Sequence, residues 1–273
     1  MTAPIQAPAA RVPRFLRGLY AGNVRSVVAR GLRVIARNNW VIVLTGFFEP
    51  VFYLLSMGLG LGALIGTVEF YGHDVPYAAY IAPALMAVSA MNGAMYDTTY
   101  NVFFKMKHAK LYDQMLSTSL GPMDVALGEI LLALFRGLLY ASGFLVVTSL
   151  LGLNLSWTAI LAIPAALIVA FGFASIGLAA TSFMKVWQHA DMVYFVMLPM
   201  FLLSATFFPI EVYPQWVQWI VMAMPLWHAV DMIRQLTTGL IQPTIWVHLA
   251  YFAGMILIGV TLATRRLKAL FLR

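Results

Sequence analysis

Four ionisable side chains lie within long apolar stretches of the sequence, where a charge is costly and usually has a partner or a function. Glu49 precedes a proline, and Asp97 lies near the end of its stretch. Glu129 and Arg136 are seven residues apart and therefore on one face of a helix. Two interpretations are open: Glu49 or Glu129 pairs with Arg136 and holds a helix bundle together, or these charges lie along a path for a transported molecule. Asp97 and Glu129 are expected at the membrane interface rather than in the interior.

The other residue types that carry out chemistry are absent or wrongly spaced. The sequence has no cysteine, which excludes disulfides, thiolate nucleophiles and cysteine-ligated metals. No two of the five histidines have a metal-ligand spacing, and neither H-E-x-x-H nor G-x-S-x-G occurs. The phosphate-binding motif G-x-x-x-x-G-K-[ST] is also missing, so we expect no catalytic residue, metal or cofactor on this chain. The nearest glycine cluster, interpreted instead as helix-packing positions, is Gly58, Gly60, Gly62 and Gly66.

The composition places these residues in a bilayer. Of 273 residues, 62% are hydrophobic and 10% are charged, with a mean hydropathy of +0.86, which is more apolar surface than a water-soluble core can hide. A membrane-crossing helix needs about 20 mostly apolar residues, and the sequence predicts an all-α polytopic membrane protein with six such helices. The predicted spans are Trp40–Gly66, Tyr77–Thr99, Val125–Leu151, Trp157–Met184, Met192–Phe208 and Ile245–Thr264.

The basic residues predict which side of the membrane each connection occupies. Residues 1–37 hold seven arginines and no acid, and further basic residues follow spans two, four and six, whereas the predicted outer connections hold only Arg234. By the positive-inside bias both termini are cytoplasmic. From Phe15 to Ile35, apolar residues interleave with arginines at helical spacing, which predicts an amphipathic interfacial helix; a basic tail that only sets topology is the alternative. Residues 38–273 then form a six-helix transmembrane domain.

The connection after the second span is long enough to carry structure of its own. Its sequence predicts a short amphipathic helix from Phe103 to Leu116, stopped by Gly121–Pro122. Because this segment is rich in lysine and lies on the predicted cytoplasmic side, it is the best candidate contact for a partner protein that supplies energy.

The connection between spans five and six, residues 209–244, is too apolar to lie free in water and is interrupted by prolines. A break at Pro214 and short re-entrant or interfacial helices are therefore predicted. Within it, His228 and Asp231 are three residues apart on one helical face, with Arg234 three further on. This spacing predicts a polar network that fixes the segment.

Four segments of the chain, taken together, resemble a known family. They are the basic N-terminal helix, FFEPVFYLLSMGLGLG in span one, YDQMLSTSLGPMDVALGEI after the lysine-rich loop, and FFPIEVYPQWVQWIVMAMPLWHAVDMIRQL. In this order they resemble the membrane subunits of ABC exporters of the second type, which include nodulation-factor, daunorubicin-type drug and polysaccharide exporters. One departure is that Gly121–Pro122 stands near the place where related chains often have Ser-Pro.

The resemblance implies a partner and an orientation. The segment Phe103–Leu116 would be a coupling helix resting in a groove of a separate ABC ATPase subunit, which would bind ATP and Mg, and two permease chains, identical or paralogous, would assemble with lipid around them in a bacterial plasma membrane. The predicted ATPase-coupling residues are Phe103, Lys105, Lys107, Lys110, Leu111, Tyr112 and Gln114. The predicted transport-path or structural polar residues are Glu49, Arg136, His228 and Asp231.

The leading functional hypothesis is the permease subunit of an ATP-driven exporter that moves a hydrophobic, amphipathic or lipid-linked molecule, such as a drug, lipid or glycolipid. So few charges in the spans favour such cargo over a small ion. The alternative is an ion-coupled secondary transporter with Glu49, Asp97 or Arg136 as carrier, which inverted repeats would favour; the sequence shows no convincing repeat. A membrane-embedded enzyme would need a clustered acid/base or metal site, and none is visible.

Overall fold

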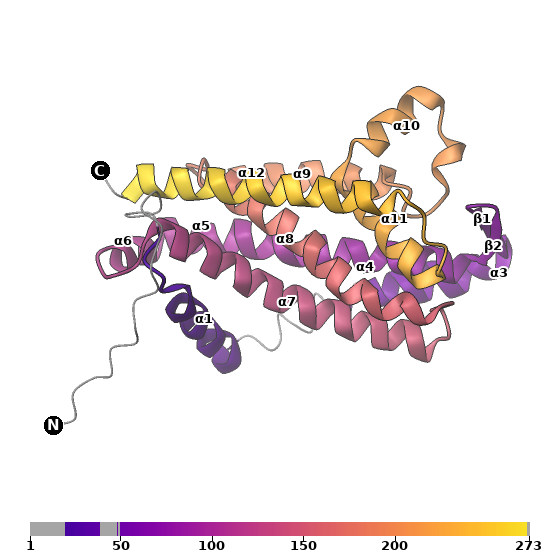
Figure 1. Ribbon diagram of the computed structural model, residues 1–273, viewed down its shortest axis with the longest axis horizontal. Coiled ribbons are helices and arrows are strands. Elements are labelled where there is room, and N and C mark those ends of the chain that lie inside the picture. Colours follow the sequence, from indigo (N-terminus) through magenta and orange to yellow (C-terminus); the bar gives the residue numbers. More distant parts are fainter. Residues whose placement is uncertain (1–19, 39–47, 49, 272–273) are drawn as a thin grey trace.

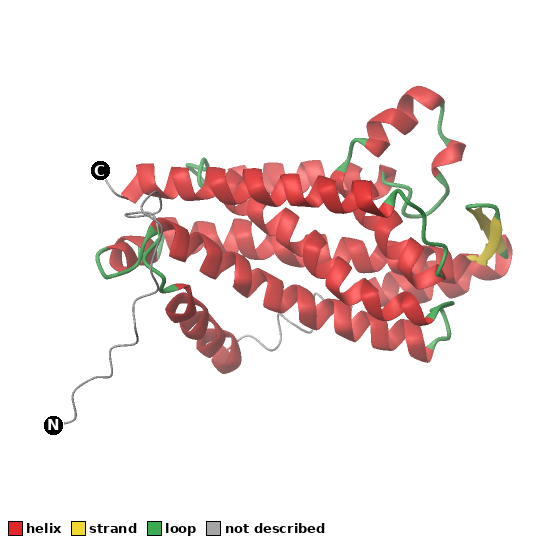
Figure 2. Ribbon diagram, in the orientation of Figure 1, coloured by secondary structure: helices red, strands yellow, loops and turns green. Residues whose placement is uncertain are grey.

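The computed structural model describes residues 20–38, 48 and 50–271 as an elongated bundle of helices (Figures 1 and 2). Helix α1, helix α6 and the C-terminal end of α12 lie at one end of the bundle, and a small β-hairpin lies at the other (Figure 1). The elements are α1 (Val24–Asn38), π-helix η2 (Leu54–Leu61), α3 (Gly62–Ile65), β1 (Thr67–Phe70), β2 (His73–Pro76), α4 (Tyr77–Tyr96), π-helix η3 (Asp97–Asn101), α5 (Val102–Lys107), α6 (Leu111–Leu116), α7 (Pro122–Leu150), 3₁₀-helix η4 (Trp157–Leu161), α8 (Ala162–Thr181), α9 (Gln188–Leu203), 3₁₀-helix η5 (Ile210–Val212), α10 (Gln215–Met222), α11 (Pro225–Thr238) and α12 (Ile245–Phe271).

Helix α4 is the centre of the bundle. It packs against α7, α8 and α11, and nearly all of its residues are buried. Its sequence is rich in alanine, with a glycine at Gly93, and such small residues let neighbouring helices approach closely. At the far side of the bundle, α8 packs against α12, where a Cβ on Gly259 would come within 2.6 Å of the Ser175 backbone. Close packing of small residues therefore fixes the arrangement of the core helices.

Four of the predicted spans are confirmed as helices long and apolar enough to cross a membrane. They occupy residues Tyr77–Lys107, Pro122–Leu150, Trp157–Thr181 and Ile245–Phe271. The described part of the first predicted span, Pro50–Ile65, and the fifth, Gln188–Leu203, are shorter apolar helices. Of the glycines in the first span, Gly58 meets Ala78 as a packing position should, whereas Gly60 and Gly66 have no described neighbour within 4 Å of a built Cβ.

The helix predicted from Phe103 to Leu116 is wrong in its boundaries. Helix α4 continues without interruption through η3 and α5 to Lys107, because Val102, Phe103 and Met106 keep an apolar face buried against the bundle. The chain then turns at Lys110, which has a left-handed backbone with φ of 45°, a conformation uncommon for residues other than glycine. Helix α6 is thus a separate helix of six residues, joined to the end of a spanning helix by a sharp turn.

The β-hairpin was not predicted by the sequence analysis. Its strands pair antiparallel, and the two residues between them, Tyr71 and Gly72, have φ of 49° and 76°. Positive φ at both central residues is the requirement of the tight turn that matches strand twist, and Gly72 meets it without strain. The hairpin leads directly into α4. It brings the Tyr71 side chain to α11, where its hydroxyl donates a hydrogen bond to Asp231.

Two other predicted segments are partly confirmed. The break at Pro214 is confirmed, since α10 begins directly after it and α11 begins at Pro225. The interfacial helix was predicted to begin at Phe15. Residues 1–19 lie outside the described part of the chain, and in the part described α1 begins at Val24. Helix α1 packs closely on α7, because a Cβ on Gly128 would lie 2.5 Å from Val27.

Candidate functional site

Arg136 is buried in the bundle and paired with Asp97. Its Nε lies 3.0 Å from Oδ2 of Asp97, and the two side chains are 5% and 11% exposed. The π-helix η3 begins at Asp97 and also receives a hydrogen bond from Thr181 of α8 to the carbonyl of Thr98; single-turn π-helices often mark functional sites. The predicted partners of Arg136 were Glu49, which lies outside the described residues, and Glu129, which has another partner.

Glu129 is paired with Lys105, whose Nζ lies 2.6 Å from Oε2 of the carboxylate. Glu129 is 4% exposed and Asp97 is 8% exposed, so the expectation that both are interfacial is wrong. The reason is that α4 and its continuation η3 pack against one side of α7, and α1 packs against α7 as well. A buried charge is tolerated when it is paired and hydrogen-bonded, and each carboxylate here has a cation.

A cavity of about 450 Å³ lies beside the Arg136–Asp97 pair, between the described end of span one and helices α4, α7 and α9. Ser89, Asn92 and Arg136 give it polar walls, and Leu85 and Val88 contribute apolar ones. Ser89 is buried and Asn92 is half-buried. The remaining lining residues are Pro50, Tyr53, Gly93, Tyr96, Tyr140, Tyr194, Met197, Leu198 and Phe201.

The predicted ATPase-coupling residues have different environments. Lys107, Lys110 and Gln114 are exposed, and Leu111 is half-buried. Phe103 and Tyr112 are buried, and burial raises the pKa of Tyr112 well above its usual value. Lys105 is half-buried in its pair with Glu129. The exposed residues form the tip of the α5–α6 turn, whereas the buried ones join that turn to the rest of the protein.

Asp124 links the start of α1 to the start of α7 through hydrogen bonds. The sequence analysis missed this residue. Its carboxylate accepts hydrogen bonds from the backbone N–H groups of Ala21, Asn23 and Gly121, at 2.8, 3.0 and 2.8 Å. It thereby joins the start of α1 to the start of α7. The signal was present in the sequence, because Gly121-Pro122 followed by an acid in the first turn is a helix N-terminal pattern.

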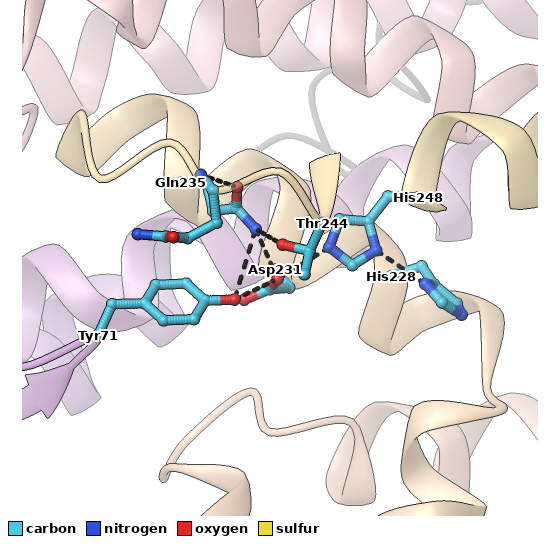
Figure 3. A network of polar contacts seen from close by, with 7 residues as sticks. Tyr71, His228, Asp231, Gln235, Thr244 and His248 are labelled. Atoms are coloured by element: carbon cyan, nitrogen blue, oxygen red, sulfur yellow. Dashed lines mark hydrogen bonds and ion pairs between the residues drawn. The ribbon is translucent and has the colours of Figure 1, made fainter. Parts of the chain in front are cut away.

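A polar network surrounds Asp231 of α11 (Figure 3). Asp231 accepts hydrogen bonds from the Tyr71 hydroxyl at 3.0 Å and from the Gln235 amide at 2.8 Å, and lies 2.8 Å from Nε2 of His248. The other ring nitrogen of His248, Nδ1, lies 2.8 Å from Nδ1 of His228. The network ties the hairpin and α12 to α11. Burial and the neighbouring Asp231 carboxylate raise the pKa of Tyr71 to about 12, so its hydroxyl remains a donor.

The predicted network is therefore right for His228 and Asp231 and wrong for Arg234. Arg234 is six residues from His228, about 240° around a helix of 3.6 residues per turn, and points elsewhere. It donates hydrogen bonds to the carbonyls of Tyr80 and Ala205, each at 3.0 Å, and lies 3.7 Å from the centre of the Tyr80 ring. His248 was missed because it lies on another helix. Among the described residues, no three histidine or acidic side chains are arranged to hold a metal ion.

Comparison with known proteins identifies the kind of protein that holds these groups. The family model described as ABC-2 type transporter matches residues 22–238, a stretch that runs from the start of α1 to the end of α11. The chain belongs to the ABC-2 type transporter family. It is therefore the membrane subunit of an ABC transporter, a multi-pass membrane protein. The buried Arg136–Asp97 pair lies inside the matched region, as do the parts of the polar network on the hairpin and α11, whereas His248 of α12 lies beyond it.

Several relatives of this ABC-2 chain carry the same name. Nodulation protein J of Rhizobium leguminosarum bv. viciae is 30% identical over 85% of this chain and 88% of its own length. The namesake from Rhizobium leguminosarum bv. trifolii is 31% identical over 82% and 85%, and that from Sinorhizobium fredii is 31% identical over 70% and 72%. The similarity thus covers most of both chains, as a shared family membership requires.

Proposed function

We propose that this chain is the permease subunit of an ATP-driven exporter that moves a hydrophobic, amphipathic or lipid-linked molecule out of the cytoplasm or the inner leaflet. Family membership and the absence of a phosphate-binding motif within the 273 residues support a separate ATPase subunit that binds ATP and Mg. The same membership favours ATP over an ion gradient as the energy source. Two permeases and two ATPase subunits complete the proposed complex.

In the proposed topology, the chain lies in a bacterial plasma membrane with both termini in the cytosol. The four long helices and the two shorter ones, Pro50–Ile65 and Gln188–Leu203, make up six spans. Helices α10 and α11 form a re-entrant pair on the outer face, with the polar network of α11 and α12 holding it to the bundle. The exposed Trp216 and Trp219 of α10 suit the headgroup level of the outer leaflet.

The observation that carries the proposal is the packing of α6 against the spanning helices α7 and α12. Its tip is exposed, but its Tyr112 ring is buried and packs edge-on against Phe271 of α12, with centroids 6.2 Å apart. Met115 of the same short helix is also buried, and α6 contacts α7 as well as α12. A partner that displaces the exposed tip therefore moves two spanning helices at once. This is the geometry that a coupling helix needs, because packed interfaces shift between discrete arrangements.

The central cavity supports a cargo with both polar and apolar parts. Its walls combine aliphatic residues with a buried serine, an asparagine and the edge of an arginine–aspartate pair. An amphipathic molecule can satisfy such walls, whereas a bare ion would leave the apolar surface in contact with water. Closure of the ATPase subunits would then rock the bundles and release cargo outward.

Three single alanine variants at the exposed tip test the proposal. Lys107→Ala, Lys110→Ala and Gln114→Ala are expected to lower cargo-stimulated ATP hydrolysis and transport in reconstituted vesicles while leaving membrane insertion intact. Lys185→Ala removes an exposed lysine outside the α5–α6 turn and is the matched control, with no change expected. Coupling that is unchanged in all three tip variants would show that the ATPase contact lies elsewhere. Transport by the purified chain alone, driven by an ion gradient, would support a secondary transporter instead.

A further inference from the structure

A second cavity, of about 360 Å³, lies between α1 and the bundle and is lined by residues of α1, η3, α5, α6 and α7 and of the turn before α6. It is distinct from the central cavity, although Arg136 lines both. Helices α1 and α6 lie together at one end of the bundle (Figure 1), and the cavity lies at that end because residues of α1 and the turn before α6 line it. In the proposed topology this is the level of the cytoplasmic headgroups. Its charged lining residues are Arg30, Asp97, Lys105, Glu129 and Arg136.

The charges in this cavity leave one cation over. Lys105 is paired with Glu129, and Arg136 is paired with Asp97. Arg30 is exposed and has no ion-pair partner among the described residues. The cavity therefore carries one net positive charge, and the group that carries it stands at the surface, where an anion can reach it.

The rim of the same cavity is apolar and exposed. Val34 of α1 is 51% exposed and Phe104 of α5 is 53% exposed, and both line the cavity. Ile35 lies beside Val34 and is half-buried. An exposed apolar rim next to a cation with no ion-pair partner in the described part of the chain suits neither a soluble anion nor a plain hydrocarbon. It suits a molecule with an anionic head and apolar chains.

We propose that this cavity binds one anionic phospholipid of the cytoplasmic leaflet. The phosphate lies on the Arg30 guanidinium, and the acyl chains lie against Val34 and Phe104. Basic pockets beside membrane helices on the cytoplasmic side are known to hold anionic lipid headgroups. The bound lipid fills the space between the interfacial helix and the bundle. The inference goes beyond the proposed function, since it requires neither ATP nor cargo.

Photo-crosslinking of the full chain in phosphatidylcholine nanodiscs tests this site. One sample contains a trace of phosphatidylglycerol with a diazirine in its acyl chain, and the other contains phosphatidylcholine with the same diazirine. Mass spectrometry then locates the labelled residues. We expect the phosphatidylglycerol probe to label the peptides that contain Val34 and Phe104 well above the phosphatidylcholine probe. Equal labelling by the two probes, or no labelling of these peptides, would overturn the proposal.

Two variants of the same helix separate the site from general attraction to a basic surface. Arg30→Gln removes the one cavity cation outside the two ion pairs. Arg33→Gln removes an exposed arginine whose Nε donates a hydrogen bond to the carbonyl of Ala29 and which does not line the cavity. One basic residue near anionic lipid is worth about 1 kcal/mol, so Arg30→Gln should lower specific labelling about fivefold. Arg33→Gln should change it less than twofold. Equal losses in the two variants would reduce the observation to surface attraction and overturn the cavity site.

A third variant and a competitor complete the test. Ala109 is exposed at the turn and lines the cavity, so Ala109→Trp should fill it and abolish specific labelling while the thermal unfolding midpoint is retained. Glycerol 1-phosphate, which has a phosphoester head without chains, should not displace the lipid probe at concentrations where unlabelled phosphatidylglycerol does. Displacement by glycerol 1-phosphate would show that the site recognises a phosphate without chains, and full labelling of Ala109→Trp would show that the lipid does not occupy this cavity. Either result would overturn the proposal.

Discussion

Removing one partner of the buried Arg136–Asp97 pair should lower the free energy of unfolding by several kcal/mol. Asp97→Asn leaves the Arg136 guanidinium, 5% exposed, without its counter-charge. Removing one partner of a buried ion pair typically costs about 3–5 kcal/mol, because an uncompensated charge remains buried. Since Arg136 also borders a cavity that can admit water, we expect the lower end, about 3 kcal/mol, for Asp97→Asn and a similar loss for Arg136→Gln.

The double variant distinguishes a true pair from two separate contributions. With both charges removed, no buried charge is left unpaired, so the loss should be no larger than that of either single variant, at most about 3 kcal/mol, rather than the sum of about 6 kcal/mol. The corresponding coupling energy of at least about 3 kcal/mol lies well beyond the deviation of about 0.5 kcal/mol expected of independent sites. Such a coupling is a factor of more than 100 in the unfolding equilibrium.

The free energies of unfolding can be measured by titrating the purified chain in mild detergent with sodium dodecyl sulfate, followed by circular dichroism. Asp113→Asn is the matched control, because Asp113 is an exposed acid and its loss should cost less than about 0.5 kcal/mol. Losses that add in the double variant would refute the reasoning, since they would mean that the two side chains do not compensate each other in the folded protein.

Three further outcomes follow from contacts elsewhere in the chain. Asp124→Ala removes the acceptor for three backbone N–H groups and should destabilise the start of α1 by about 1–3 kcal/mol, seen as faster hydrogen exchange at Ala21 and Asn23; unchanged exchange there would contradict it. Gly128→Val should displace α1, because even a Cβ would lie 2.5 Å from Val27, and protease cleavage between α1 and α4 should rise. Tyr71, with its pKa raised from 10.0 to about 12, stabilises the fold below pH 10 and loses that contribution as the pH rises to 12. Tyr71→Phe should remove this pH dependence from the thermal midpoint, and a dependence that persists would point to another group.

Much of the architecture could be predicted because the bilayer imposes it. Hydrocarbon thickness sets the length of an apolar helix, so the spans confirmed at α4, α7, α8 and α12 are visible as runs in the sequence. Proline restricts the backbone locally, which is why the break at Pro214 was also predictable. The missing phosphate-binding motif is likewise a property of the sequence alone. These features depend on neighbours along the chain or on the solvent.

The choice of partners was decided by the tertiary structure. The sequence places Glu129 on the same helical face as Arg136, yet the extension of α4 through a π-helix brings Asp97 to Arg136 and gives Glu129 to Lys105. His248 joins the polar network around Asp231 from a different helix. A pair within one helix follows from the residue spacing, but a pair between helices depends on how closely and at what rotation the helices pack. That information lies in the shapes of all the buried side chains together, so no short stretch of sequence contains it.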